Sequence, residues 1–357
     1  MKIAFVDLTH TGRYVHAIYF SMGIGYVAAY TKKAFDDADI SLFKYPDDLS
    51  AHLQGNRPDI VAFSSYMWNE KLHLAFAAGI KAAHPSTAIV FGGPNFPTVP
   101  AEQSAYLTKR PEIDFFVEGE GELGFVELCR VLAREDYDVK TVKDSGIAIG
   151  NTRYLSKGTL IASQMLPRIL ELDEHIPSPY LTGLFDKFFD DKLTPMIQTS
   201  RGCPYSCTFC HDGVDYMNKT RRFSQDRIEQ ELEYIRARKT VPSLALADLN
   251  WGMFPEDIET ARWLANSRRA SGWPRTVQTA TAKNQKKRML AISALLGDGL
   301  SVGASVQSTD PDVLAKIKRS NISVDAIVEM ANGVRIAGGR TFSEVIVCLP
   351  GDTKDKH

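Results

Sequence analysis

Short apolar runs alternate with longer amphipathic segments over the first 135 residues, and this alternation constrains the fold more than any other feature. Apolar runs of this kind are typical of buried strands, and helical periodicity between them indicates parallel strands joined by helices. We predict strands at Ile3–Val6, Ile40–Phe43, Asp59–Ser64, Ala88–Phe91 and Asp114–Val117. We predict helices at Gly25–Phe35, Leu72–Ala83 and Glu122–Leu132. The pattern favours a doubly wound, Rossmann- or flavodoxin-like parallel sheet with helices on both faces.

The same alternation resumes near Thr194 and continues along the second half of the sequence. Here we predict strands at Met196–Thr199, Ser243–Ala247, Thr276–Ala280, Leu300–Val306 and Phe342–Leu349. The first helix of this half is expected over Ser224–Arg238, because a serine is a favourable N-cap and basic residues suit the last turn. The second half is therefore also predicted to be α/β.

A chain of 357 residues exceeds one ordinary domain, so two domains are expected. We place the first at residues 1–135 and the second at residues 193–357, with a linker at residues 136–192. Within the linker, a hairpin is predicted over Gly146–Tyr154, with its turn at Gly150-Asn151.

Composition and charge exclude several classes of protein. Hydrophobic residues make up 44% of the chain and charged residues 24%, as in an ordinary globular protein. A net charge of −1 attracts neither nucleic acid nor an anionic membrane, and no apolar run of about 18 residues suggests a membrane span. We interpret the basic runs at 283–288 and 316–319 as solvated helix faces. Cys129 and Cys348 are expected to be small buried hydrophobes, so we predict a cytoplasmic protein without disulfides.

Three of the five cysteines, Cys203, Cys207 and Cys210, lie within eight residues in a C-x3-C-x2-C pattern. Thiolates are soft ligands that suit iron–sulfur clusters or zinc. Three ligands instead of four leave one iron of a cluster open for a substrate. One alternative is a zinc site with His211 as fourth ligand, although adjacent Cys210 and His211 would have difficulty binding one tetrahedral ion. The other alternative is accidental clustering.

This spacing resembles the signature of the radical S-adenosylmethionine (SAM) superfamily. The resemblance implies that the three thiolates bind three irons of a 4Fe–4S cluster. The fourth iron would then bind the amino and carboxylate groups of SAM. It also implies reductive cleavage of SAM to methionine and a 5′-deoxyadenosyl radical, which is chemistry that the cofactors supply. An electron donor such as flavodoxin or ferredoxin is the implied partner.

The resemblance also implies where SAM would bind, because groups that contact ligands in such barrels lie at the carboxyl ends of strands. The predicted SAM-binding residues are Phe209, Asp248, Asn250, Ser305 and Gln307. Phe209 matches the aromatic residue that lies against adenine, and Asp248 matches the strand end that meets the SAM amino group. No catalytic residue is predicted. The family barrel has six strands, whereas this sequence ends eight residues after Leu349, so we expect a partial barrel truncated after strand five.

The first half resembles the cobalamin-binding domain that precedes many radical SAM domains. The matching segments are 22–26, 63–66, 92–94 and 118–122. The implied cobalamin-binding residues are Ser64, Gly92, Gly93, Glu118, Gly119 and Glu120. Relatives that donate a histidine to cobalt carry D-x-H-x-x-G, whereas His10 stands one place later in this sequence. We therefore expect cobalamin without a protein histidine ligand, and we expect His10 to make hydrogen bonds within its loop. The alternative is a domain that has lost the cofactor and only supports the other one.

Together the two resemblances imply a cobalamin-dependent radical SAM enzyme, most simply a C-methyltransferase acting on a small-molecule biosynthetic intermediate. A rearrangement or ring-forming reaction without methyl transfer is one alternative. A non-catalytic metal-binding paralogue is another. Methylthiolation of tRNA or protein is disfavoured, because those relatives carry extra cysteine ligands in the first domain and this chain has only Cys129 there.

Overall fold

The computed structural model describes residues 1–356, which divide into a first compact unit, Met1–Lys187, and a second unit that begins at Phe188. Each unit is described by itself. The first unit therefore extends past residue 135, the boundary expected from the sequence, and includes most of the predicted linker.

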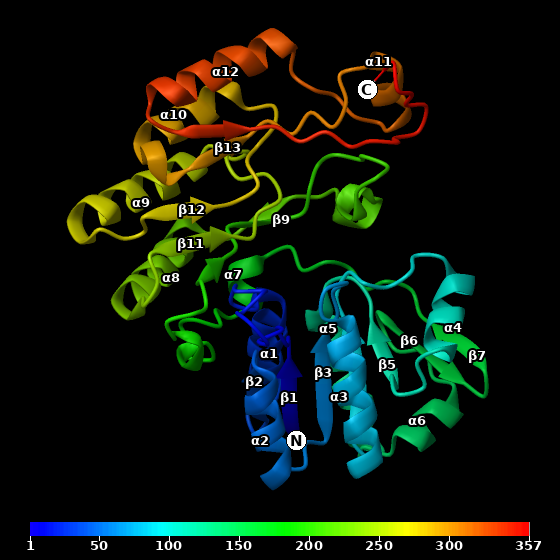
Figure 1. The fold of residues 1–357 in the computed structure, drawn as a ribbon. Helices are drawn as coiled ribbons and strands as arrows, with labels where there is room; N and C mark the ends of the chain where they lie inside the picture. Colours follow the sequence, from blue (N-terminus) through cyan, green and yellow to red (C-terminus); the bar gives the residue numbers. More distant parts are fainter. Residues whose placement is uncertain (357) are drawn as a thin grey trace. The chain divides into compact units, whose positions relative to one another are not determined.

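A seven-stranded sheet with the order β2-β1-β3-β4-β5-β6-β7 forms the centre of the first unit (Figure 1). Its strands are β1 Lys2–Val6, β2 Asp39–Phe43, β3 Ile60–Ser64, β4 Ala88–Gly92, β5 Phe115–Val117, β6 Thr152–Ser156 and β7 Thr159–Ala162. The first five are parallel, whereas β6 and β7 add an antiparallel hairpin to the edge. All five predicted strands of this sheet are confirmed, each within one residue of its predicted ends.

Helices pack on the sheet of the first unit. They are α1 Met22–Ala34, α2 Pro46–Gly55, α3 Glu70–Ala83, α4 Pro100–Thr108, α5 Gly121–Arg134, α6 Val139–Ser145 and α7 Leu172–His175. The α1 and α5 helices contact each other, and the rings of Phe5 and Phe125 lie 5.1 Å apart beneath them. Leu49 of α2, Ala77 of α3 and Leu107 of α4 belong to a separate buried cluster with the sheet. Helices on both faces bury the strands and confirm the predicted layered α/β fold.

The predicted hairpin over Gly146–Tyr154 is wrong in its position. The hairpin is formed by β6 and β7, and its turn is Lys157-Gly158, where both residues have positive φ. Gly150 instead packs closely against other parts of the unit, because a Cβ atom there would lie 2.3 Å from the Glu127 carboxylate. Gly150 is therefore needed for close packing and not for a turn, and the turn of the hairpin lies seven residues later.

The second unit continues the strand–helix alternation with shorter strands. Three parallel strands have the order β12-β11-β8, and two more, β13 and β14, form a parallel pair. Their bounds are β8 Met196–Ile197, β11 Ser243–Leu246, β12 Thr276–Gln278, β13 Ser301–Gly303 and β14 Arg340–Phe342. A single bridge between Val277 and Leu300 links the two groups. The first four predicted strands are confirmed as shorter strands.

The prediction for the fifth strand is largely wrong, because β14 ends at Phe342, where the predicted strand begins. Beyond it, the chain bridges only Val345 to Gln307. Val345 and Val347 are 59% and 63% exposed, whereas Ile346 and Leu349 pack in a small cluster, so only part of the apolar run is buried.

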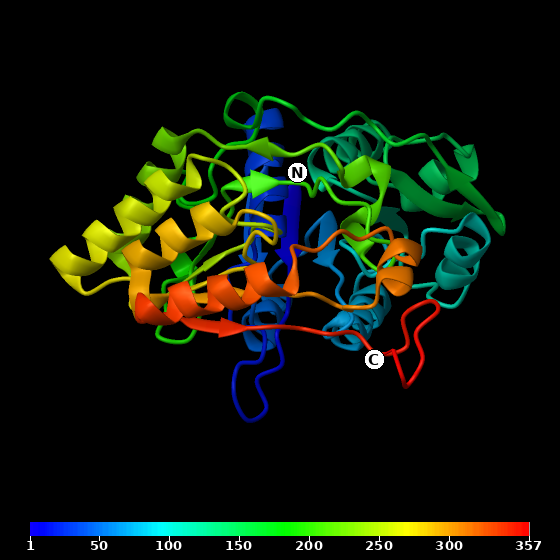
Figure 2. The same cartoon turned by 90° about the horizontal axis from the view of Figure 1, so that it is seen from above.

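The α-helices of the second unit are α8 Gln225–Arg238, α9 Asp257–Ser271, α10 Lys286–Leu296, α11 Pro311–Lys316 and α12 Val324–Ile336. Figures 1 and 2 show α8, α9, α10 and α12 side by side along the strands, in agreement with their contacts. The Ser224 side chain accepts a hydrogen bond from the Arg227 amide, which confirms the predicted N-cap of α8. No helix within residues 1–356 is both long and apolar enough to span a bilayer.

Candidate functional site

A closed loop at the carboxyl end of β8 carries the three clustered cysteines. The antiparallel strands β9 Ser200–Arg201 and β10 Arg221–Arg222 join the two ends of this loop. Gly202 has a φ of +94°, and a Cβ atom there would lie 2.5 Å from the Lys219 carbonyl oxygen. The Cys203 amide donates a 2.9 Å hydrogen bond to the Met217 carbonyl. Glycine tolerates this positive φ and this close contact with the Lys219 carbonyl, whereas a side chain would not fit. The backbone at Gly202 therefore determines where the cysteine loop starts.

The loop buries two of its three thiols. Cys203 and Cys207 are 8% and 6% exposed, whereas Cys210 is exposed. The Cys210 amide donates to the Cys207 carbonyl at 3.0 Å, and Gly213 packs so tightly that a Cβ would lie 2.2 Å from that same carbonyl oxygen. Among residues 1–356, no three His, Cys, Asp or Glu side chains converge into a metal-binding group. Cys210 is the exposed one of the three candidate ligands.

Polar side chains from two distant segments approach the buried sulfurs. The Asn250 Nδ2 atom, in the segment after β11, donates to the Cys203 Sγ atom at 3.2 Å. The Arg319 Nη1 atom, after α11, lies 3.8 Å from the Cys207 Sγ atom. Soft thiolate donors with a cation and an amide donor beside them suit an anionic iron–sulfur cluster, so the residues fit this group by their chemistry.

Two side chains from the basic runs lie at this loop, which corrects the interpretation of the runs as solvated faces for Lys283 and Arg319, whereas Lys287, Lys316 and Lys318 are exposed as expected. Arg319 is 8% exposed. Lys283 is half-buried, and its Nζ atom lies 6.0 Å from the centroid of the Tyr205 ring. Burial, and then the positive charge of Arg319, lower the pKa of Lys283. Cationic side chains therefore gather beside the cysteines.

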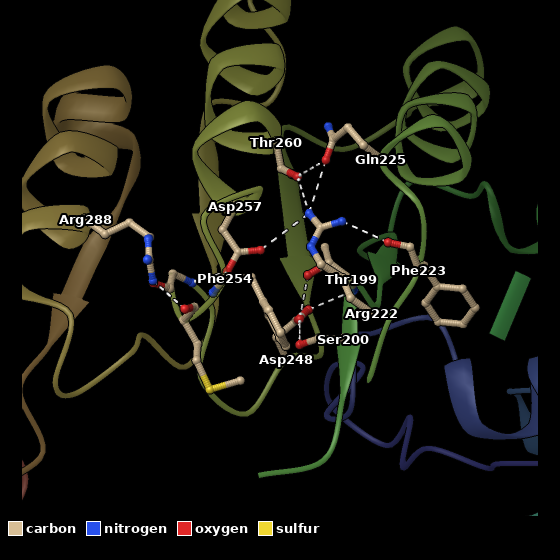
Figure 3. A network of polar contacts seen from close by, with 12 residues as sticks. Thr199, Ser200, Arg222, Phe223, Gln225, Asp248, Phe254, Asp257, Thr260 and Arg288 are labelled. Carbon is tan, nitrogen blue, oxygen red and sulfur yellow. Dashed lines mark hydrogen bonds and ion pairs between the residues drawn. The ribbon is translucent and has the colours of Figure 1, made fainter. Parts of the chain in front are cut away.

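Asp248, predicted to contact SAM, is buried at the end of β11 and is held by three hydrogen bonds (Figure 3). Its carboxylate accepts from the Thr199 amide at 2.9 Å, from the Thr199 hydroxyl at 2.6 Å and from the Ser200 hydroxyl at 2.6 Å. Burial raises the pKa of Asp248, although these donors oppose the shift. The carboxylate thus ties the end of β11 to the segment that enters the cysteine loop.

Two other predicted SAM residues have buried oxygen atoms without partners. Within residues 1–356, no hydrogen-bond donor reaches the Asn250 Oδ1 or the Gln307 Oε1 atom. Gln307 also has a φ of +65°, which is unusual for a residue other than glycine. Buried polar atoms are normally paired, so each of these oxygens is suited to accept a hydrogen bond from a ligand.

The remaining two predicted SAM residues lie on the edges of the same region. The Ser305 hydroxyl donates to a Glu344 carboxylate oxygen at 2.5 Å. Phe209, next to the third cysteine, is 38% exposed. Whether either residue contacts SAM stays a prediction.

A buried network supports the segment after β11 (Figure 3), and none of its residues was predicted as part of the site. The Asp257 Oδ2 atom accepts from the amides of Gly252 at 2.8 Å and Phe254 at 3.0 Å. The Arg222 guanidinium lies 3.5 Å from the Asp257 Oδ1 atom and donates to Thr260 at 3.2 Å. Burial, and then the charge of Asp248, raise the pKa of Asp257 to about 6. One signal in the sequence was available, because Asp257 follows Pro255 closely and an acidic residue is favoured in the first turn of a helix.

At the carboxyl edge of the first sheet, a buried ion pair organises the loops. The Lys44 Nζ atom lies 2.9 Å from the Asp7 Oδ2 atom, which also accepts from the Ser21 hydroxyl at 2.6 Å. The Asn69 amide donates to the other Asp7 oxygen at 2.9 Å. Buried His73 accepts a hydrogen bond from the Leu8 amide, and its burial lowers its pKa to about 4. These groups hold the ends of β1, β2 and β3 together.

The residues predicted to bind cobalamin lie around this edge. Gly93 has a φ of +101°, and a Cβ atom there would lie 2.8 Å from the Ser65 carbonyl oxygen, so the β4 loop can adopt this path only with glycine. Glu118 pairs with Arg153 at 3.0 Å. Glu120 pairs with Arg168 at 2.9 Å. The others are Ser64 at the end of β3, Gly92 at the end of β4, and exposed Gly119, which has positive φ.

Exposed apolar side chains also occur at this edge. Met67 and Trp68, just after β3, are 83% and 54% exposed, and Trp68 stacks on Tyr66 with ring centroids 4.5 Å apart. The His10 ring nitrogen Nε2 lies 3.1 Å from the Trp68 carbonyl oxygen, which confirms the predicted hydrogen bond within the loops. An exposed aromatic face beside glycine loops is suited to a large flat ligand.

Comparisons with known proteins match one family model to each half of the chain. The family described as "B12 binding domain" matches residues 11–129, and the family described as "Radical SAM superfamily" matches residues 197–357. The cobalamin-dependent radical SAM methyltransferase TokK of Streptomyces tokunonensis is 33% identical over 305 residues, covering 83% of this chain and 43% of TokK. The 2-(S-pantetheinyl)-carbapenam-3-carboxylate methyltransferase of Streptantibioticus cattleyicolor is 34% identical over 304 residues, with 82% and 43% coverage. The chain thus spans about two fifths of the length of these curated relatives.

A solved structure shares the fold along nearly the whole chain. This is the radical SAM methyltransferase TsrM from Kitasatospora setae, solved with tryptophan substrate and a SAM analogue. The TM-score is 0.70 at 14% identity, and the match covers 99% of this chain and 69% of TsrM. At this identity the similarity establishes the arrangement of the elements.

Proposed function

This chain belongs to the radical SAM superfamily and carries a B12-binding domain, and we propose on that premise that it acts as a cobalamin-dependent methyltransferase. The observation that carries the proposal is the cysteine loop, in which Asn250 and Arg319 approach two buried sulfurs beside a third thiol. When bound, a 4Fe–4S cluster supplies the electron that cleaves SAM to a 5′-deoxyadenosyl radical, and cobalamin carries the methyl group to be transferred.

The residues of the second unit are assigned separate roles. Cys203, Cys207 and Cys210 are proposed as the three cluster ligands. The free Asn250 Oδ1 and Gln307 Oε1 atoms are acceptors suited to the ammonium group of SAM, because a buried acceptor without a partner gains most from a charged donor. Asp248 holds the end of β11 through Thr199 and Ser200, and so positions Asn250.

In the first unit, the exposed face of Trp68 and Met67 and the glycine loop at Gly92-Gly93 are proposed to receive cobalamin. No histidine is assigned to cobalt, since His10 is within hydrogen-bonding distance of the Trp68 carbonyl oxygen and His73 is buried. A small-molecule intermediate is the proposed methyl acceptor, and a flavodoxin or ferredoxin is the proposed electron donor. The substrate named for the S. cattleyicolor relative is the first compound to assay.

Anaerobic reconstitution with iron, sulfide and hydroxocobalamin tests this function. With dithionite and SAM, the reconstituted chain is expected to form 5′-deoxyadenosine. With the carbapenam substrate, or an acceptor found by screening, SAM labelled in its methyl group is expected to give labelled product. Label that never enters a product while deoxyadenosine accumulates would favour the rearrangement or ring-forming alternative. A chain that binds zinc and no iron would favour the non-catalytic one.

A further inference from the structure

Arg319 is a buried cation whose position the fold fixes closely. Its Nε atom donates to the Asn321 Oδ1 atom at 2.8 Å, and its Nη2 atom donates to the Ser305 carbonyl. Asn321 is held in turn, because its Nδ2 atom donates to the Val306 carbonyl at 2.8 Å and to the Ser308 carbonyl at 3.1 Å. These bonds aim the remaining Nη1 atom at the Cys207 Sγ atom, 3.8 Å away.

This guanidinium has no carboxylate partner in the described part of the chain. A buried charge without a counter-charge is costly, so such residues are normally paired with an anion. The anion that the position offers is the thiolate of Cys207, and through it the negative charge of a thiolate-ligated cluster. Arg319 is therefore placed where the charge of the cluster changes on reduction.

The two buried cysteines have different neighbours. Cys203 receives a neutral amide donor from Asn250 at 3.2 Å, whereas Cys207 faces a full positive charge. Hydrogen bonds to sulfur and net charge near the cluster both set the reduction potential of an iron–sulfur cluster. One-electron reduction adds a negative charge, so a fixed cation stabilises the reduced form more than the oxidised form.

We propose that Arg319 raises the reduction potential of the cluster by holding a positive charge against Cys207, which brings the cluster within reach of its electron donor. This inference rests on the proposed function, because it requires the cluster. Arg319 is a positioning residue in this account: it touches a ligand sulfur and neither SAM nor substrate. In the reaction concerned, one electron passes from a flavodoxin- or ferredoxin-type donor to the oxidised cluster, and no bond is made or broken.

The test is a redox titration of the reconstituted full chain without SAM, monitored by electron paramagnetic resonance of the reduced cluster. Arg319→Gln is expected to decrease the equilibrium constant for reduction at least tenfold, a shift of about −59 mV for one electron. Arg319→Lys keeps the charge and is expected to stay within about threefold of the wild type. Arg268→Gln is the matched control, since Arg268 donates to the Leu296 carbonyl and pairs with Asp298.

The outcomes separate this inference from the proposed function. A full iron content with an unchanged potential in Arg319→Gln would show a purely structural role for Arg319 and overturn the inference alone. If the Arg319→Gln variant binds no iron, the Asn321→Ala variant provides the test. This substitution removes the hydrogen bond that holds the Arg319 guanidinium but keeps its positive charge. Asn321→Ala is expected to decrease the reduction constant about threefold, and an unchanged value overturns the inference. A wild-type chain that takes up no iron overturns the proposed function and this inference together.

Discussion

The two units use the carboxyl ends of their parallel strands in different ways. In the first unit the buried Asp7 carboxylate accepts from Lys44, Ser21 and Asn69, so both of its oxygens are paired and its charge is compensated. In the second unit, within the described residues, the Asn250 Oδ1 and Gln307 Oε1 atoms are buried without partners. The Asp7 groups thus form a buried junction whose central charge is compensated, with an exposed aromatic surface beside it, whereas the second edge leaves two buried acceptor atoms for which we propose a ligand.

The largest expected effect on stability comes from removing the buried ion pair between Lys44 and Asp7 in the first unit. Lys44→Met should lower the free energy of unfolding by about 3–5 kcal/mol, because it leaves the buried Asp7 carboxylate without its counter-charge. The expected iron content of the reconstituted chain is unchanged. Urea unfolding followed by circular dichroism, with iron analysis alongside, makes both measurements.

The matched control for that prediction is Lys140→Met. Lys140 pairs with Asp144 on the surface of α6 and its side chain is 85% exposed. An exposed pair at this spacing contributes little to stability, so the free energy of unfolding should change far less than in Lys44→Met. Equal effects of the two lysine substitutions would remove the distinction between a buried junction and a surface ion pair.

The second prediction concerns pH and the buried network of the second unit. The pKa of Asp257 is raised from 3.8 to about 6 in the folded chain, so between these values the native state binds more protons than the unfolded state. Stability is then lost as the pH rises from about 4 to 6.5, by roughly 3 kcal/mol. Asp257→Asn removes this dependence, which urea unfolding across that pH range would show as curves that diverge from the wild type.

Asp298→Asn provides a control of opposite sign. The hydrogen bond and charge of Arg268 lower the pKa of exposed Asp298, so its contribution to stability is lost as the pH falls. Parallel stability curves for the wild type and Asp257→Asn would mean that the carboxylate at the start of α9 carries no burial cost.

The smallest predicted effect tests whether the exposed aromatic surface at Trp68 in the first unit binds cobalamin. Trp68→Ala should weaken cobalamin binding about tenfold, or about 1.4 kcal/mol, because the stacked Tyr66–Trp68 face is lost. The free energy of unfolding should change little, since Trp68 is 54% exposed. Equilibrium dialysis with hydroxocobalamin measures the affinity. Ile336→Ala, which removes an exposed apolar side chain from the second unit, should leave the affinity for cobalamin unchanged.

Elements with a strong pattern of apolar residues in the sequence were predicted well, and elements with a weak pattern were missed. The five parallel strands of the first sheet were predicted within one residue, because β1, β3, β4 and β5 are runs of mostly buried apolar side chains and β2 ends in buried Leu42 and Phe43. Helices α2 and α4 were missed, since α2 buries only Leu49 and α4 only Gln103 and Leu107. Such helices carry almost no hydrophobic periodicity to detect.

The candidate site was predictable only where its residues are close in sequence. The C-x3-C-x2-C spacing pointed to the cysteine loop, and the order of the strands pointed to Asp248 and Asn250. Arg319 lies 112 residues from Cys207 and belongs to a basic run, so local sequence favoured a solvated face. Its burial depends on how the segment after α11 packs on the loop, which a short-range pattern does not encode.

The most direct test of the account is the metal content of the anaerobically reconstituted chain, measured with and without SAM. The account predicts about four iron and four sulfide ions per chain and a resonance signal of the reduced cluster that changes when SAM is added. Both are expected to disappear in the triple variant Cys203→Ala, Cys207→Ala, Cys210→Ala and to persist in Cys348→Ala, whose thiol is exposed outside the loop. Iron content that survives the triple substitution, or a single zinc ion in place of iron, would contradict the account.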